Sequence, residues 1–128
     1  MNHILVRGQK IRIGVTGIIK TGWNAKADYR VCVAASEREM GLRDSIPVGA
    51  TLSMAAGSAA QVLLAWEEPD RLHRGLYGAS FNATMLSQVR RRGWAQSVGE
   101  REPGVASVSA PVRGPSGRVL AALCNYRG

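Results

Sequence analysis

The sequence has few aromatic residues, few cysteines and histidines, and no long apolar run. Aromatic residues make up 5% of the 128 positions, and Phe81 is the single phenylalanine, so the core must consist mainly of Ala, Val, Leu and Ile. No apolar run approaches the roughly 20 residues that cross a bilayer, and the N-terminus lacks an apolar signal core. We therefore expect a cytoplasmic protein of one globular domain with no membrane association.

Metal binding is not expected from the cysteines and histidines. Cys32 and Cys124 lie far apart, and His3 and His73 are the only histidines. Neither histidine stands at ligand spacing from a cysteine. We predict two buried, reduced thiols and no metal or cofactor.

Catalysis is not expected either. The serines, Ser58 among them, have no obvious histidine base, because His73 lies in a charged segment. The paired carboxylates have charged neighbours and are expected to form a solvated face; they are Glu67, Glu68, Glu100 and Glu102. The glycine-rich stretches lack the lysine of a phosphate-binding loop. We predict that the protein is not an enzyme.

The positive charge is concentrated at the N-terminus. The net charge is +8, and residues 1–30 carry +5 of it, which leaves +3 for the rest of the chain. A second basic cluster, Arg90–Arg92, precedes Gly93 and Trp94. Such a cluster next to an aromatic residue is compatible with nucleic-acid binding. It is equally typical of cations at the C-terminal end of a helix dipole, followed by a core tryptophan.

The periodicity predicts strands in the first third of the chain and helices in the middle. Alternating apolar residues indicate strands over 11–20 and 30–35. Ser53 is expected to cap a helix that ends near Trp66, with small residues over 55–60 that let a ligand or another element approach closely. A short helix is expected over 70–76. Asn82 or Thr84 should cap a third helix, which Gly93 ends.

The last third of the chain is predicted to form strands over 94–98, 104–113 and 118–126. Residues 114–117, Gly-Pro-Ser-Gly, form a turn signal between the last two, which predicts an antiparallel hairpin. Together these elements indicate an α+β protein.

Several segments, in this order, resemble the effector-binding domain of IclR-type transcriptional regulators. They are residues 30–34, 46–49, 52–60, 63–65, 89–94, 100–104, 110–112 and 117–123. The resemblance implies a GAF-like curved antiparallel sheet flanked by helices. It covers 30–128 as an effector-binding domain that is incomplete at its C-terminus, and residues 1–29 form a poorly matched basic segment with a possible strand.

The resemblance also implies a function. Such a domain binds a small-molecule effector, often a carboxylate or an aromatic acid, on the concave side of the sheet. It controls transcription within a homodimer or homotetramer, and it contacts DNA only through an N-terminal winged helix-turn-helix that this chain lacks. The alternative is a basic nucleic-acid-binding module that uses Arg90–Arg92 and the N-terminal arm.

The pocket implied by the resemblance lies at the start of the first helix and on the neighbouring strands. Its residues are Leu52, Met54, Ser58, Ala59, Ser97, Ser107, Cys124 and Tyr126. Backbone N–H groups at the helix start can receive an anion, and polar side chains from two strands can orient it. Each position could instead be an ordinary packing position. Some relatives carry an acidic residue where this sequence has Ser97, so a metal-binding or amine-binding role is not expected there.

Overall fold

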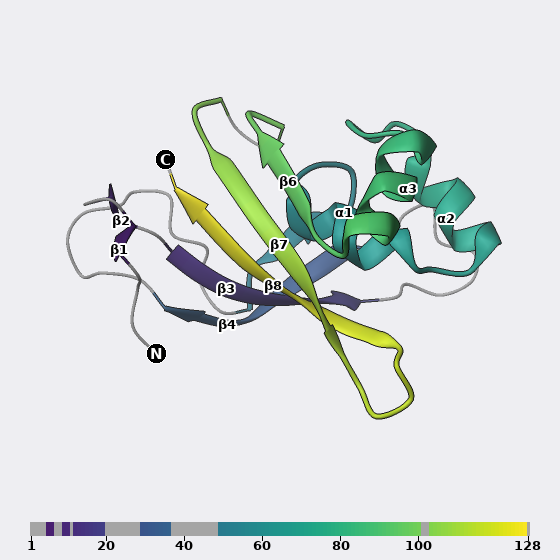
Figure 1. The fold of residues 1–128 in the computed structure, drawn as a ribbon, viewed down its shortest axis with the longest axis horizontal. Helices are drawn as coiled ribbons and strands as arrows, with labels where there is room; N and C mark the ends of the chain where they lie inside the picture. Colours follow the sequence, from purple (N-terminus) through teal and green to yellow (C-terminus); the bar gives the residue numbers. More distant parts are fainter. Residues whose placement is uncertain are drawn as a thin grey trace.

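The computed structural model describes the backbone of residues 5–6, 9–10, 12–19, 29–36, 49–100 and 103–127, and side chains over 30–32, 49–100 and 103–125. Figure 1 shows the three described helices grouped together beside one end of the main sheet. The elements, in chain order, are β1 (Leu5–Val6), β2 (Gln9–Lys10), β3 (Arg12–Ile19), β4 (Tyr29–Ser36), β5 (Thr51–Ser53), α1 (Ser58–Ala65), α2 (Pro69–Leu76), α3 (Ala83–Arg92), β6 (Ala95–Val98), β7 (Ala106–Arg113) and β8 (Val119–Arg127).

The main sheet has six strands in the order β5-β4-β3-β8-β7-β6, and every neighbouring pair is antiparallel. The predicted strands over 11–20 and 30–35 are confirmed as β3 and β4. The three predicted strands of the last third are confirmed as β6, β7 and β8. Residues 114–117 connect β7 to β8 as the predicted hairpin. β3 lies between β4 and β8, at the centre of the sheet.

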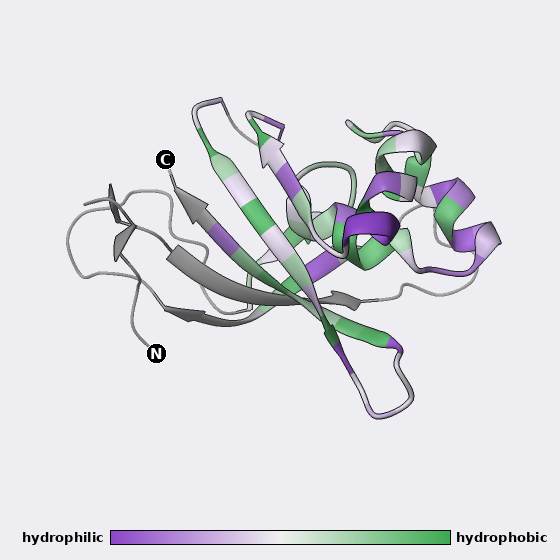
Figure 2. Ribbon diagram, viewed as in Figure 1, coloured by the Kyte–Doolittle hydropathy of each residue, from purple (hydrophilic) through white to green (hydrophobic). Residues whose placement is uncertain are grey.

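One face of β6, β7 and β8 is buried and the other is exposed. The residues of the buried face are Ala95, Ser97, Ser109, Ala122 and Cys124, and exposed apolar residues of the other face are Val98, Val108, Val112 and Leu123. This alternation follows from the strand period of two, and Figure 2 shows that the hydropathy of the residues also alternates along β7. The buried face therefore defines where α1 packs.

Helix α1 is the centre of the core, because all eight of its residues are buried. It packs against β6, β7 and β8 on one side and against α2 and α3 on another. A helix that carries small and apolar residues all round is suited to such a central position. Its neighbours in the core include Phe81, Leu86 and Val89.

The ends of α3 follow the sequence prediction. The Asn82 side chain accepts a hydrogen bond from the Met85 N–H at 2.9 Å, which is the expected N-terminal cap. Gly93 has a φ of 87° and ends the helix in the left-handed conformation, and its N–H donates to the Val89 carbonyl at 2.8 Å. Helix α2 begins at Pro69, one residue before the predicted start, at a position where a helix tolerates proline.

The predicted start of the first helix is wrong. Ser53 does not cap it, because Ser53 ends strand β5 and pairs with Tyr29 of β4. The Ser53 hydroxyl instead accepts a hydrogen bond from the Ala55 N–H at 2.9 Å. Residue Gly57 caps α1 with a φ of 97°, a backbone conformation that favours glycine. The sequence did not predict β5, because three residues carry no periodic signal and their pairing with β4 is not local.

Cys32 and Cys124 are buried thiols, as the sequence predicts. No described helix combines the length and the apolar character that crossing a membrane requires.

The close approach of α2 to α1 gives a test of the fold. A Cβ atom on Gly75 would lie 2.6 Å from Cδ1 of Leu64, which is buried. We expect Gly75→Ala to lower the free energy of unfolding by about 1–3 kcal/mol through overpacking. In an isolated helix the same change would stabilise by up to about 1 kcal/mol. The sign of the change in the free energy of unfolding, measured by urea unfolding, therefore distinguishes overpacking from helix propensity. Arg74→Ala, at an exposed position of α2, is the control, and stabilisation by Gly75→Ala would contradict this packing.

Candidate functional site

The segment before α1 is held by a buried arginine. The side chain of Arg30, on β4, is 3% exposed. Its Nε donates to the Ser53 carbonyl at 3.2 Å and its Nη2 to the Ala56 carbonyl at 3.5 Å. A buried guanidinium needs such acceptors, and these two bonds fix the path of the chain into α1.

Four serine hydroxyls meet at the start of α1 and form one hydrogen-bonded chain, which we call the serine chain. The Ser58 Oγ lies 2.6 Å from the Ser107 Oγ and 2.8 Å from the Ser109 Oγ. The Ser107 Oγ also lies 2.8 Å from the Ser97 Oγ. The order of the serine chain is therefore Ser97, Ser107, Ser58, Ser109. Ser58, Ser97 and Ser109 are buried, and Ser107 is half-buried.

The register of the sheet explains this meeting. Ser97 of β6 pairs directly with Ser107 of β7, so both side chains lie on the same face. Ser109 follows two residues later on β7 and therefore lies on that face as well. Ser58 is the first residue of α1, which packs on the same face. Three strand positions and one helix start thus place hydroxyl groups at one point.

The serine chain has hydrogen-bonding capacity to spare. Four hydroxyls carry four protons, and the three bonds between them use three. The bonds can also run in either direction along the serine chain, because each hydroxyl donates and accepts. The arrangement can therefore present either a donor or an acceptor to a further polar group.

The carboxylate of Glu100 lies beside this point, at the N-terminal end of α1. Its Oε1 accepts from the Gly57 N–H at 3.1 Å, and its Oε2 accepts from Nε2 of Gln61 at 3.0 Å. Gln61 is 1% exposed. The predicted solvated face is wrong for Glu100, because the turn after β6 brings this side chain over the helix start, where a negative charge is favoured. Glu102 lies outside the described residues.

Part of the predicted anion-receiving end of α1 is thus occupied by the protein's own carboxylate. Glu100 takes the N–H of the capping residue, Gly57. The N–H groups of Ser58, Ala59 and Ala60 belong to the first turn, where a helix provides no acceptor. These N–H groups lie next to the serine chain, in buried residues.

The structure places the other predicted pocket residues in different surroundings. Met54, Ala59 and Cys124 are buried members of the apolar core, and Cys124 pairs with Ser109 across the sheet. Leu52 is half-buried on β5 and pairs with Arg30. The backbone of Tyr126 in β8 pairs with that of Ser107, and its side chain lies outside the described residues.

Three residues at this point were not predicted: Ser109, Gln61 and Glu100. The spacing of two between Ser107 and Ser109 could have revealed Ser109, since both must lie on one face of a strand. Nothing local in the sequence marks Gln61 or Glu100, because their contact depends on where the turn after β6 lies.

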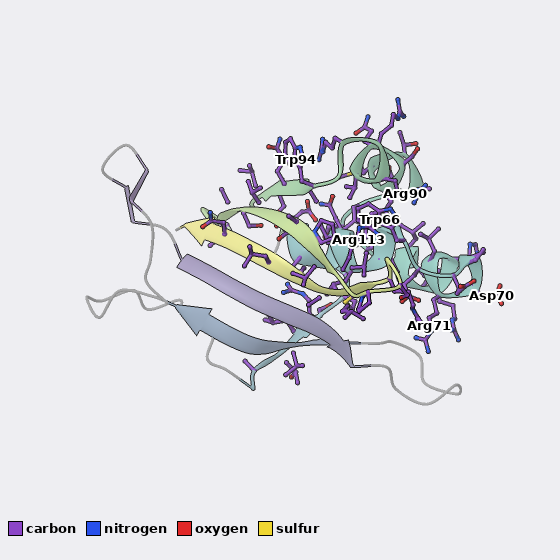
Figure 3. All side chains as sticks on the ribbon, turned by 60° about the horizontal axis from the view of Figure 1, so that its bottom comes forward. Trp66, Asp70, Arg71, Arg90, Trp94 and Arg113 are labelled. Atoms are coloured by element: carbon purple, nitrogen blue, oxygen red, sulfur yellow. The ribbon has the colours of Figure 1, made fainter. Side chains whose placement is uncertain are left out.

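The basic cluster at the end of α3 has partners within the protein. Arg90 donates from Nη1 to the Ala65 carbonyl at 2.8 Å, at the end of α1. The Arg92 guanidinium lies 4.3 Å from the centroid of the Trp94 ring, and its Nε donates to the Trp94 carbonyl at 2.8 Å. Figure 3 shows Arg90 among the helices and Arg113 beside Trp66. These contacts support the interpretation of Arg90–Arg92 as a helix end. The predicted core tryptophan is wrong, because Trp94 is 39% exposed.

Sequence comparison decides the family. The family described as "Bacterial transcriptional regulator IclR C-terminal" matches residues 25–124. The chain belongs to this family. The resemblance noted from the sequence and the predicted α+β fold are therefore both confirmed. No curated protein matches the chain in sequence.

Solved structures with the same fold include domains of other transcriptional regulators. The C-terminal domain of a protein described as a transcriptional regulator from Vibrio cholerae is 24% identical, with a TM-score of 0.72 over 90% of this chain and 70% of that one. A regulator from Rhodococcus sp. RHA1 is 26% identical, with a TM-score of 0.71 over 91% of this chain and 50% of that one. The inducer-binding domain of the PobR transcription factor from Acinetobacter is 22% identical, with a TM-score of 0.71 over 91% of this chain and 73% of that one.

The serine chain predicts an order of stability effects. Ser58→Ala removes a buried hydroxyl that has two hydroxyl partners, and it leaves Ser109 without a partner in the serine chain. We therefore expect a loss of about 1–3 kcal/mol in the free energy of unfolding. Ser97→Ala removes an end of the serine chain and should cost roughly 1 kcal/mol. Ser80→Ala, at an exposed position, should change stability by less than about 0.5 kcal/mol. Urea unfolding of the three variants tests this order, and a Ser58→Ala effect no larger than that of Ser80→Ala would contradict it.

Proposed function

We propose that this IclR C-terminal domain binds a small-molecule effector at the start of α1, with the serine chain as the polar centre of the site. The effector is a small carboxylate or an aromatic acid. The observation that carries the proposal is the meeting of four hydroxyls from α1, β6 and β7 at one point. A fold that only needed a core could place apolar residues there, since buried polar groups add little net stability.

The surroundings of the serine chain suit a metabolite. Binding sites for small molecules combine a mainly apolar lining with a few convergent polar groups. Met54, Ala59 and Cys124 supply apolar surface in the core around α1. The spare hydroxyl proton and the first-turn N–H groups supply donors. We propose that an effector places its polar group on the serine chain and its apolar body among these residues.

None of the four hydroxyls is hydrogen-bonded to a base among the described side chains, which favours binding over catalysis. Over the part of the chain with described side chains, the four serine hydroxyls bond to one another and to no histidine or carboxylate. A serine nucleophile needs such a base. We therefore propose a sensing role and no enzymatic activity.

A relative supports the ligand class. The structure of the PobR inducer-binding domain is that of a double mutant in complex with 3-hydroxybenzoic acid, which is an aromatic acid.

We further propose that the effector acts on transcription through assembly. The domain would function in the cytoplasm within a homodimer or homotetramer, and DNA would be bound by an N-terminal winged helix-turn-helix outside this chain. The two buried thiols fit a reducing compartment. The effector would bias the presentation of the DNA-binding domains by binding one arrangement more tightly, which is a coupling free energy between two sites.

Titration calorimetry against short carboxylates and aromatic acids tests the proposal. We expect at least one member of the panel to bind, and Ser107→Ala to weaken its binding by roughly 5–20-fold through the loss of one or two hydrogen bonds. Ser80→Ala should bind as the wild type does. An absence of heat from every compound, or equal affinities for wild type and Ser107→Ala, would contradict the proposal.

A further inference from the structure

Glu100 brings a negative charge to the site without a described cationic partner on its carboxylate. Both hydrogen bonds to its oxygens come from neutral donors, the Gly57 N–H at 3.1 Å and the Gln61 amide at 3.0 Å. Gln61 is itself anchored, because its Nε2 also reaches the Gln96 carbonyl at 3.5 Å. Among the described residues, the carboxylate is therefore held in place by neutral donors at the N-terminal end of α1 and keeps its negative charge there.

The same carboxylate adjoins the serine chain along two paths. Gly57, which donates to it, directly precedes Ser58. Ser97 lies three residues before Glu100, at the end of β6 where the turn begins. The turn is closed by a hydrogen bond of 2.8 Å from the Gly99 N–H to the Val105 carbonyl. The carboxylate is thus bonded to the backbone of the residue that precedes Ser58, and it belongs to the turn that follows the strand of Ser97.

We propose that Glu100 determines the specificity of the effector site by taking the place of a ligand carboxylate at the start of α1. The site then selects effectors that bring a hydroxyl group to the serine chain. A carboxylate on such an effector points away from α1. This inference rests on the proposed function and specifies which polar group of the effector meets the serines.

The physical basis is repulsion between like charges in a partly buried site. Two carboxylates within a few ångströms at an intermediate dielectric repel strongly enough to change affinity by tenfold or more. A ligand hydroxyl has no such cost, because it can donate to Glu100 or to a serine and accept from another serine. The first-turn N–H groups remain available to the hydroxyl oxygen.

The test compares ligands of similar shape that differ in charge. Benzoate, benzyl alcohol and 3-hydroxybenzoate are titrated into wild type, Glu100→Gln, Glu100→Asp and Glu68→Gln. Glu100→Gln keeps the shape and loses the charge, whereas Glu100→Asp keeps the charge on a shorter side chain. Glu68→Gln removes a charge from an exposed residue with no side-chain cap bond, so it controls for net charge.

For the wild type we expect benzyl alcohol and 3-hydroxybenzoate to bind at least roughly tenfold more tightly than benzoate. Glu100→Gln should lower the ratio of the affinity for benzyl alcohol or 3-hydroxybenzoate to the affinity for benzoate by about tenfold, because benzoate gains affinity. Glu100→Asp and Glu68→Gln should keep the wild-type ratio. If Glu100 had only a structural role, Glu100→Gln would instead weaken the binding of all three ligands to a similar extent.

Two results would overturn the inference. One is an unchanged ratio in Glu100→Gln, and the other is a ratio in Glu100→Asp that equals that of Glu100→Gln. A failure of the proposed function has a different signature, since none of the three compounds would then bind to any of the four proteins at millimolar concentration, and both proposals would fall.

Discussion

The hydrogen bonds between the Ser58 hydroxyl and the hydroxyls of Ser107 and Ser109 are the contacts on which the rest of the structure depends. They join the first residue of a fully buried helix to the face of the sheet that covers it. Charged side chains then hold both ends of that helix. Arg30 binds the carbonyl of Ala56 just before α1, Glu100 binds the N–H of its cap, and Arg90 binds the carbonyl of Ala65 at its last residue. Helix α1 is thereby fixed in position and rotation.

The N-terminal end of α1 is where a bound ligand would first affect the structure. The polar contacts of α1 with the sheet lie at its N-terminal end, whereas its body packs through apolar side chains. A ligand that joins the serine chain would change the contacts of that end first. Because the turn after β6 reaches the same end through Glu100, a change there would reach the edge of the sheet as well. The proposed regulation therefore requires no movement other than a change in these contacts at the N-terminal end of α1.

The sequence predicts most elements of the fold because their signals are local. Asn82 and Gly93 mark the ends of α3, and the glycine-rich turn marks the β7–β8 hairpin. Prediction from the sequence fails where a contact joins segments that are distant along the chain. Ser53 has the side chain of a helix cap but belongs to β5, since β4 lies beside it. Ser58, Ser97 and Ser107, which the resemblance points to, do lie together in the structure. Glu100 is wrongly predicted to be solvated, because its charged neighbours say nothing of the helix end that it reaches.

The most direct test of the serine chain as a binding centre is an amide correlation NMR titration of the wild-type chain. With 3-hydroxybenzoate as the probe, the account predicts that the largest shifts fall on Ser58, Ala59, Ser97 and Ser107, where the ligand would meet the N-terminal end of α1. Shifts confined to Arg90–Trp94, or to Val108 and Leu123 on the exposed face of the sheet, would contradict it.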